Sequence, residues 1–291
     1  MISVCIPVYN FNIEPLVREL KVQVDDLNCD IEIIVIDDAS ELEFRKQNKL
    51  ACSDVGYLQL PENIGRAKIR NLFLEYASMD YLLFLDGDSL IHKPKFLKDY
   101  ITLLDKADVI YGGREYPVDL PSSEQYLSWY YGSWVESKPV VKRIEEGYLA
   151  FMSNNFLINA AVFEDYNFNE AINGYGHEDT YFSYQLSENN ISLLHVDNPV
   201  LNGDLETNAV FVLKLEKAIE NLVLLYENDS DKFTGFVNLL AYYKQCNKVK
   251  RVVIKYSFLV LKPLLRSFLL KGTASLKMIS FYKLGCFLNK V

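Results

Sequence analysis

Short apolar runs alternate with amphipathic stretches along the first 112 residues. The runs Ile33–Ile36 and Leu82–Leu85 are apolar at every position, as is typical of strands buried on both faces. Strands that alternate with helices indicate βαβ units, which predict an α/β fold with a mostly parallel sheet and helices on both faces. The predicted strands are Ile2–Pro7, Ile31–Ile36, Val55–Leu60, Tyr81–Leu85 and Val109–Gly112. The predicted helices are Ile13–Leu27, Glu41–Leu50, Ile64–Ala77 and Pro94–Leu104.

The pattern changes after Gly113, where residues 114–150 are aromatic and read as loop-rich. From Thr207 the pattern is helical to the end, and we expect breaks at Pro263 and Gly272. We therefore divide the chain into an α/β domain, residues 1–205, and a C-terminal helical region, residues 206–291. The elements predicted between them are a strand at Asn155–Asn159, a helix at Glu178–Glu188 and a strand at Ser192–Val196.

Composition and charge narrow the classes of protein. Half of the 291 residues are hydrophobic and 24% are charged, a globular balance that argues against disorder. The net charge of −9 hides an asymmetry, because residues 247–291 hold ten of the 30 basic residues and no acidic one. The acidic remainder would repel phosphate, so we expect no nucleic-acid partner.

The sequence gives few signs of export or of membrane spanning. The five cysteines are scattered and form no C-x-x-C pair, which disfavours disulfides and zinc and fits a reducing compartment. The N-terminus lacks a basic segment before its first apolar run, so we expect no signal peptide. No apolar run is long enough to predict a transmembrane helix.

Acidic pairs follow two of the buried strands. Asp37-Asp38 comes after Ile33–Ile36, and Asp86-Gly87-Asp88 comes after Leu82–Leu85. Parallel strands end at the same edge of a sheet, where open α/β sheets bind ligands. Clustered carboxylates need a cation, and oxygen ligands favour Mg²⁺ or Mn²⁺, which would also neutralise a diphosphate leaving group. The alternatives are an ordinary turn at Asp86–Asp88 and a helix cap at Asp37-Asp38.

Motifs of other nucleotide-binding classes are missing. No G-x-G-x-x-G sequence follows the first strand, which argues against a dinucleotide-binding domain. No G-K-[ST] loop supports an ATPase.

Five segments together resemble glycosyltransferase family 2, with its Rossmann-like GT-A fold, across roughly residues 1–206. They are Ile6-Pro7-Val8-Tyr9-Asn10, Val35-Ile36-Asp37-Asp38-Ala39-Ser40, Asn63-x-Gly65-x-Ala67-x-x-Arg70-Asn71, Asp86-x-Asp88, and Gly174-Tyr175-Gly176-His177-Glu178-Asp179. The resemblance implies an inverting hexosyltransferase that uses a nucleotide-diphosphate sugar, usually a UDP-sugar.

The resemblance also implies where the donor binds. Pro7 and Tyr9 would line the nucleoside pocket, and Asp38 would bind the base. Arg70 would lie near the donor phosphates, although it could equally be an ordinary surface arginine of a helix. These positions predict a donor site at the strand ends.

Metal ligands are implied at Asp86, which would face the ribose or the metal, and at Asp88. The expected cofactor is Mn²⁺ or Mg²⁺. Relatives with a segment like Asp197-Asn198-Pro199-Val200 are expected to carry a histidine shortly afterwards, near the metal and diphosphate, but Asn202 stands there in this chain. Asparagine is a weaker ligand, so a weakly active or inactive sugar-nucleotide-binding subunit remains an alternative.

The catalytic base implied by the resemblance is Asp179, with Glu178 beside it to hold sugar hydroxyls. An inverting transfer needs one base to take the proton of the attacking acceptor hydroxyl. The flexible residues Gly174 and Gly176 precede this pair, although the pair could simply favour a helix N-terminus. His177 is interpreted as structural or supporting.

The acceptor site is less defined. An aromatic stretch contains both tryptophans, Trp129 and Trp134, and one of them is expected to stack on a sugar ring. The alternative is core packing of a helix. Asn154-Asn155 could hold sugar hydroxyls or form a turn.

The basic, apolar tail predicts contact with a membrane surface, because a helix with apolar and cationic faces lies among anionic headgroups. The alternative is that the tail packs on the acidic body. We therefore expect a cytoplasmic protein, peripheral at the inner membrane face, that transfers sugar to a glycan or lipid-linked acceptor. Sugar-phosphate nucleotidyl transfer is a less favoured alternative, because no glycine-rich basic loop follows the first strand.

Overall fold

The computed structural model describes residues 1–228 and 231–291. Within these residues the main sheet has seven strands in the order β3-β2-β1-β4-β8-β6-β9. Its strands are β1 (Ile2–Val8), β2 (Ile31–Asp37), β3 (Gly56–Gln59), β4 (Tyr81–Leu85), β6 (Val109–Tyr111), β8 (Asn155–Asn159) and β9 (Leu193–His195). The α/β prediction is confirmed, and the strands are parallel except that β8 runs antiparallel to β4 and β6.

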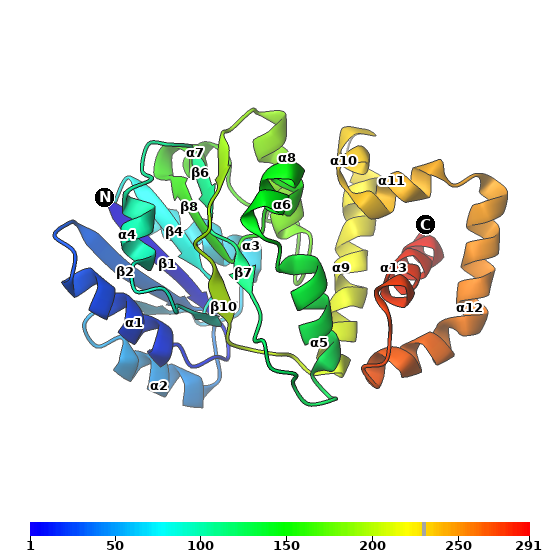
Figure 1. Cartoon of the computed structure of the whole chain (residues 1–291), viewed down its shortest axis with the longest axis horizontal. Helices are drawn as coiled ribbons and strands as arrows, with labels where there is room; N and C mark the ends of the chain where they lie inside the picture. Colours follow the sequence, from blue (N-terminus) through cyan, green and yellow to red (C-terminus); the bar gives the residue numbers. More distant parts are fainter. Residues whose placement is uncertain (229–230) are drawn as a thin grey trace.

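Helices cover both faces of this sheet (Figure 1). Alternate residues of β1 point to opposite faces, so that Val4 packs with one core and Cys5 with the other. The first face is covered by α1 (Glu14–Asp25) and α4 (Phe96–Ile101), and the second by α3 (Arg66–Leu72), α7 (Ala160–Asp165) and α8 (Glu178–Glu188). The helix α2 (Leu42–Ala51) follows β2.

The stretch predicted to be loop-rich, residues 114–150, contains short elements that hydrophobic periodicity did not distinguish. They are β7 (Arg114–Glu115), α5 (Tyr126–Tyr131) and α6 (Val140–Glu146), with a π-helical turn at Gly132–Glu136. In the described residues β7 joins β5 (Ser89–Leu90) and β10 (Val200–Asn202) in a small sheet of order β5-β10-β7. This small sheet lies at the carboxyl end of β4 and shapes the site described below.

The C-terminal region is helical in its described part, as predicted; residues 229–230 lie outside it. Its helices are α9 (Asn208–Asn228), α10 (Asp231–Phe236), α11 (Asn238–Gln245), α12 (Lys248–Leu270) and α13 (Leu276–Lys290). The predicted break at Pro263 is wrong, because α12 continues through this proline. Figure 1 shows that the ribbon of α12 instead changes direction along its length, as a proline kink would produce. The predicted break at Gly272 is confirmed, with φ of +69° after the helix end.

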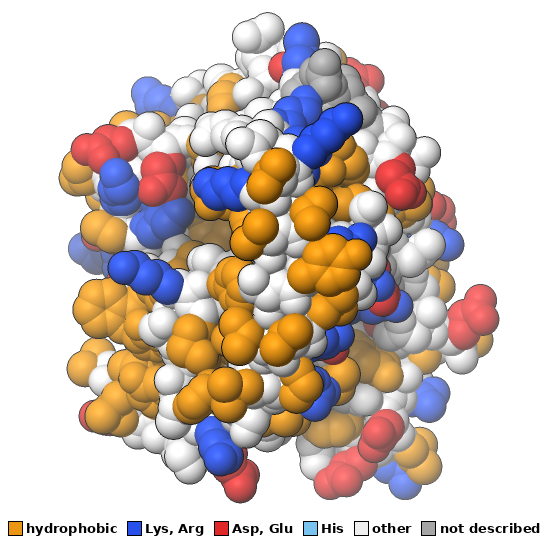
Figure 2. Space-filling model, turned by 90° about the vertical axis from the view of Figure 1, so that its right-hand side faces the viewer, with side chains coloured by type: hydrophobic (Ala, Val, Ile, Leu, Met, Phe, Trp, Pro, Cys, Tyr) orange, Lys and Arg blue, Asp and Glu red, His pale blue; other side chains and the backbone are white. Residues whose placement is uncertain are grey.

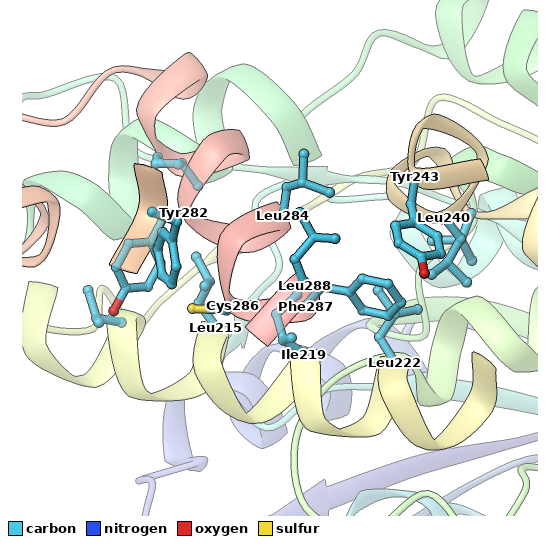
Figure 3. Close-up of a cluster of buried hydrophobic side chains, with 14 of the residues drawn as sticks. Leu215, Ile219, Leu222, Leu240, Tyr243, Tyr282, Leu284, Cys286, Phe287 and Leu288 are labelled. Atoms are coloured by element: carbon cyan, nitrogen blue, oxygen red, sulfur yellow. The ribbon is translucent and has the colours of Figure 1, made fainter. Parts of the chain in front are cut away.

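Helix α9 carries a third hydrophobic core (Figure 3). Its residues Leu215, Ile219 and Leu222 face Phe287 of α13 and Leu240 of α11. The α13 lysine Lys290 pairs with Glu220 of α9 at 3.1 Å. The alternative that the tail packs on the rest of the chain therefore holds for α13. No helix in the described part is long and apolar enough to cross a membrane.

Gly285 of α13 allows α12 and α13 to approach each other. A methyl group added there would meet the ring of Phe258 at 2.1 Å, and Phe258 is fully buried. We expect Gly285→Ala to lower the free energy of unfolding by about 1–3 kcal/mol through overpacking. Gly235→Ala in α10 is the matched control, because nothing lies within 4 Å of its added methyl. Thermal unfolding of both variants tests this, and equal stability would contradict the close packing of the two helices.

Candidate active site

Adjoining cavities lie at the carboxyl ends of the parallel strands. One, of about 490 Å³, is lined by Pro7, Tyr9 and Asp38. The other, of about 250 Å³, is lined by Glu178, Asp179 and Asn154 among others. Their shared lining residues are Arg66, Asp86, Asp88, Tyr175, Asp204, Glu206 and Lys214. The predicted convergence of both acidic pairs on one edge of the sheet is therefore confirmed for Asp38, Asp86 and Asp88.

Asp37 and Asp38 bind backbone and side-chain donors of the surrounding loops. Asp37 Oδ1 accepts a hydrogen bond from Ser40 N at 2.7 Å. The N-cap residue of α2 is Glu41, and no side chain caps this helix, so neither aspartate is its cap. Asp38 Oδ1 and Oδ2 accept hydrogen bonds from Ile64 N at 2.7 Å and Gly65 N at 3.1 Å. Burial raises the pKa of Asp38 above its usual range, against the lowering effect of these two N–H groups. Asp38 thereby fixes the loop that forms one wall of the cavity of about 490 Å³.

Asp86 is held between two arginines of α3. Arg70 Nη2 lies 2.5 Å from Asp86 Oδ1, and Arg66 Nη2 lies 3.2 Å from Oδ2. Burial alone would raise the pKa of Asp86, but the charges of Arg70 and Arg66 outweigh it and hold the pKa below its usual range. The Arg70 side chain is only 2% exposed, which rules out the surface-arginine alternative.

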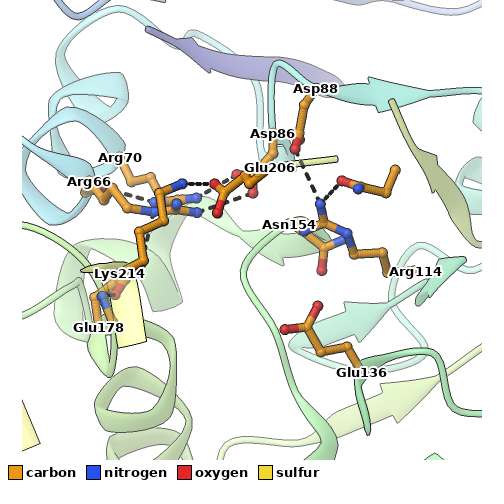
Figure 4. Close-up of polar contacts among 12 residues, drawn as sticks. Arg66, Arg70, Asp86, Asp88, Arg114, Glu136, Asn154, Glu178, Glu206 and Lys214 are labelled. Atoms are coloured by element: carbon orange, nitrogen blue, oxygen red, sulfur yellow. Dashed lines mark hydrogen bonds and ion pairs between the residues drawn. The ribbon is translucent and has the colours of Figure 1, made fainter. Parts of the chain in front are cut away.

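Arg66 extends this ion-pair network to the start of α8, as Figure 4 shows. Its Nε lies 2.9 Å from Glu178 Oε1, and its guanidinium lies 5.3 Å from the centre of the Tyr175 ring. Glu178 also accepts a hydrogen bond from Gly176 N at 2.9 Å. One arginine thus connects the end of β4 with the loop that leads into α8.

Asp88 meets a third arginine through the small sheet. Arg114 Nη2 lies 3.2 Å from Asp88 Oδ2 and donates a hydrogen bond to Asn202 Oδ1. Asn202 Nδ2 in turn donates to the carbonyl of Asp204 at 2.5 Å. Burial raises the pKa of Asp88, and the Arg114 charge opposes this. Strands β5, β7 and β10 bring these three side chains together from distant parts of the chain.

The predicted metal ligands do not form a cation-binding cluster. Within the described chain, no three His, Cys, Asp or Glu side chains converge as metal ligands. Asp86 and Asp88 instead contact guanidinium groups, and the Asn202 oxygen is turned toward Arg114. A metal at Asp88 would share this carboxylate with the positively charged Arg114, and both oxygens of Asp86 already contact arginines, so the arrangement does not fit a divalent cation.

Asp179 lies in the first turn of α8 and lines the cavity. The preceding backbone has positive φ at Gly174, Gly176 and His177, and a Cβ on Gly176 would meet Ala218 of α9 at 2.4 Å. Asp179 Oδ1 accepts a hydrogen bond from Thr180 N at 2.7 Å. Burial, reinforced by the Glu178 charge, raises the pKa of Asp179 to about 7. Such a carboxylate can accept a proton near neutral pH.

Helix α9 fixes the loop before Asp179. The side-chain amide of Asn221 donates to the carbonyls of Asn173, Tyr175 and Gly176 at 3.0 to 3.1 Å. Lys214, one further α9 residue, lies 4.7 Å from the centre of the Tyr175 ring. The C-terminal region therefore supplies one wall of the site.

Of the remaining predicted residues, some line the cavities and others lie away from them. Asn154 lines the cavity, whereas buried Asn155 donates to the carbonyls of Gly113 and Asn198 and supports the fold. His177 also lines the cavity, and burial lowers its pKa to about 3, so it stays neutral. Neither tryptophan lines either of the two cavities. Trp129 donates a hydrogen bond to the Pro117 carbonyl, and Trp134 is 69% exposed.

Several cavity residues were not predicted from the sequence, among them Arg66, Arg114, Tyr116, Glu136, Tyr175, Glu206 and Lys214. A local signal existed for Arg66, which lies four residues before Arg70 and thus on the same helix face. Arg114 follows Gly112-Gly113 directly after a predicted strand. Lys214 had no local signal, because only tertiary packing brings α9 to the strand ends.

Comparison with known proteins identifies the family of the chain. Residues 3–167, more than half of the chain, match the model of the family described as glycosyl transferase family 2. The chain belongs to glycosyltransferase family 2.

Two uncharacterized glycosyltransferases resemble this family 2 enzyme in sequence. One, from Haemophilus influenzae, is 32% identical over 133 residues, which are 43% of this chain and 50% of that protein. The other, from Rickettsia conorii, is 34% identical over 96 residues, or 32% of this chain and 16% of that protein. The matched part thus spans no more than half the length of either relative.

Solved structures show the same GT-A fold. The mannosyltransferase PcManGT from Pyrobaculum calidifontis, in complex with GDP-Man and Mn²⁺, has a TM-score of 0.56 at 13% identity, covering 93% of this chain and 85% of that one. Glucosyl-3-phosphoglycerate synthase from Mycobacterium tuberculosis, with Mg²⁺ and UDP, has a TM-score of 0.53 at 14% identity, covering 79% and 81%. At identities this low, the structural similarity supports the fold alone.

The raised pKa of Asp179 predicts the pH dependence of activity. A base must be ionised, so, if Asp179 accepts the proton of the acceptor, kcat/KM should fall as pH drops below about 7. Glu178→Gln removes a like charge, which should move this acidic limb to lower pH. Initial rates from pH 5 to 9 for both proteins test this. An acidic limb that stays at the same pH in the variant would contradict the coupling of the two carboxyl groups.

Proposed function

We propose that the enzyme is an inverting hexosyltransferase in which Asp179 is the catalytic base. The observation that carries this proposal is the position of Asp179. This residue lines the cavity of about 250 Å³, which adjoins the cavity lined by Pro7, Tyr9 and Asp38. The pKa of Asp179 is also close to neutral pH. Asp179 and Asp86 line the same cavity, so an acceptor and a donor could meet between them. This arrangement suits a single displacement at the anomeric carbon.

The donor, which we propose to be a UDP-sugar, would lie across the shared boundary of the cavities. Pro7 and Tyr9 would contact the nucleoside, and Asp38 would bind the base with acceptor capacity left on its oxygens. Asp86, fixed by its arginines, would face the ribose. The sugar would then extend toward Glu178 and Asn154.

The reaction balances with these groups alone. The acceptor oxygen forms a bond to the anomeric carbon while its proton passes to the Asp179 carboxylate. The bond from the anomeric carbon to the phosphate oxygen breaks, and its electron pair stays on the departing nucleoside diphosphate. Attack opposite the leaving group inverts the anomeric configuration.

The acceptor would approach from the side of α9 and α13. A further cavity of about 270 Å³ shares Tyr131, His177, Thr180 and Lys283 with the catalytic cavity. We propose that it receives the acceptor, a glycan or a lipid-linked sugar. One of Trp129 and Trp134, which both lie outside these cavities, would stack on a sugar ring of such an acceptor.

Donor turnover tests the proposed reaction. Purified protein incubated with a panel of UDP- and GDP-sugars should release nucleoside diphosphate from one donor, and Asp179→Asn should lower the rate about 10²–10⁴-fold. Asp165→Asn, an exposed position at the end of α7, is the matched control and should keep the wild-type rate.

Two other outcomes would point elsewhere. If wild type and Asp179→Asn were equally inert with every donor and acceptor but bound nucleotide sugar alike, the chain would be a binding or assembly subunit. Transfer of a nucleotidyl group to a sugar phosphate would favour the nucleotidyltransferase alternative, which family membership opposes.

We further propose that α12 places the enzyme on an anionic membrane, at the cytoplasmic face. Its outer face, defined as Val249, Val253, Tyr256, Val260 and Leu264, is apolar and exposed along the helix. Figure 2 shows hydrophobic side chains gathered on this side of the molecule with lysines and arginines around them. Among the described residues no carboxylate forms an ion pair with a basic residue of α12, whereas Lys290 of α13 pairs with Glu220. Such a helix suits the headgroup layer of anionic lipid.

Vesicle binding tests this surface. Wild type should co-sediment with phosphatidylglycerol-containing vesicles and less with pure phosphatidylcholine vesicles, because each basic residue near the surface contributes about 1 kcal/mol. Val260→Glu, at a position 79% exposed, should weaken binding at least tenfold. Val118→Glu, at a position 95% exposed on the α/β domain, is the matched control and should bind as wild type does.

Failure of the wild-type protein to bind either kind of vesicle would contradict the proposed membrane surface. If light scattering then showed a dimer that Val260→Glu makes monomeric, the outer face of α12 would be a self-association surface.

A further inference from the structure

We propose that the guanidinium of Arg114, rather than a divalent metal, stabilises the diphosphate leaving group in this enzyme. The inference rests on the proposed transfer reaction and adds a catalytic residue to it. Arg114 lies between Asp88 and Asn202, the side chains from which metal coordination would be expected. A protein cation therefore stands where the sequence predicted Mn²⁺ or Mg²⁺.

The position of Arg114 is built by the fold. One nitrogen, Nη2, contacts both Asp88 Oδ2 at 3.2 Å and the Asn202 side-chain oxygen, so the two anchors share one donor. The guanidinium also lies 5.3 Å from the centre of the Tyr116 ring. Pairing of β7 with β10 and of β10 with β5 sets all of these positions through backbone hydrogen bonds. The Arg114 side chain is 14% exposed and lines the catalytic cavity.

The chemistry of the anchors suits an arginine. Arginine stays protonated, and its planar fork matches phosphate oxygens. The carboxylate of Asp88 balances part of the charge, while Asn202 adds a neutral oxygen that accepts from a guanidinium without competing for a proton. A cation that is fixed before the reaction stabilises charge that develops on the leaving group.

Other cations stand at the same boundary. Arg66 and Lys214 line both cavities, and Lys214 pairs with Glu206 there. As the bond between the anomeric carbon and the phosphate oxygen breaks, the electron pair moves onto the diphosphate, and the acceptor proton moves to Asp179. Arg114 hydrogen-bonds the departing phosphate and forms no covalent bond, so it is unchanged after each turnover.

Metal removal separates this proposal from a metal-dependent reaction without any variant. With excess EDTA, wild type should release nucleoside diphosphate from its donor at a rate within twofold of that with Mn²⁺. Calorimetric titration with UDP should give the same affinity in EDTA and in Mn²⁺. Activity lost in EDTA and restored by Mn²⁺, together with UDP binding that needs Mn²⁺, would overturn the role of Arg114 and leave the transferase proposal standing.

Variants then test the residue itself. Arg114→Ala should lower kcat at least 100-fold and weaken UDP binding in EDTA, and Arg114→Lys should recover part of both, because it keeps the charge but loses the fork. Arg18→Ala, an exposed arginine of α1, is the matched control and should behave as wild type. If Arg114→Lys turned over the donor in EDTA as fast as wild type, the positive charge alone would be sufficient. If Arg114→Ala had the wild-type rate and UDP affinity, the proposal would be contradicted. Absence of donor turnover and UDP binding under every condition would instead refute the transferase reaction, and this inference with it.

Discussion

The buried carboxylate of Asp86 and its two arginines are the interaction on which the site depends. A carboxylate at the end of a fully buried strand is costly unless it is paired. Arg70 and Arg66 supply that pairing from successive turns of α3, and Arg66 also reaches Glu178 at the start of α8. Removing Asp86 would leave the buried guanidinium of Arg70 without a carboxylate partner, which is why these positions act as a unit. The strand end, α3 and α8 are thus joined by charge as well as by the apolar core that they share.

The loop before Asp179 adds a second constraint, which comes from the C-terminal region. Asn221 of α9 holds three carbonyls of this loop, and Gly176 lets the loop approach Ala218. The raised pKa of Asp179 follows from this enclosure, because burial is its largest cause. The C-terminal region is therefore part of the site, since its first helix completes the cavity in which Asp179 is desolvated.

Much of the fold was predictable from local patterns, while part of the site was not. Strands such as Leu82–Leu85 are apolar at every position, and the acidic residues that follow them identify the binding edge of the sheet. Arg114 could not be identified in this way, because its role depends on β-strand pairing between segments more than 80 residues apart. Pro263 was misjudged for a related reason: a proline breaks an isolated helix, but tertiary packing of Phe258 and Leu265 holds α12 together on both sides of it.

Helix α9 lies between the proposed membrane surface on α12 and the proposed catalytic cavity. Asn208, at the start of α9, donates to the carbonyls of Ser123 and Leu270, so it ties the end of α12 to the segment before α5. Along the rest of α9, one side packs against α13 and another meets the loop before Asp179. A membrane bound by the outer face of α12 would thus be connected to the catalytic cavity through a continuous packed core. A lipid-linked acceptor would then enter beside Lys283, on the wall that the membrane-facing region itself provides.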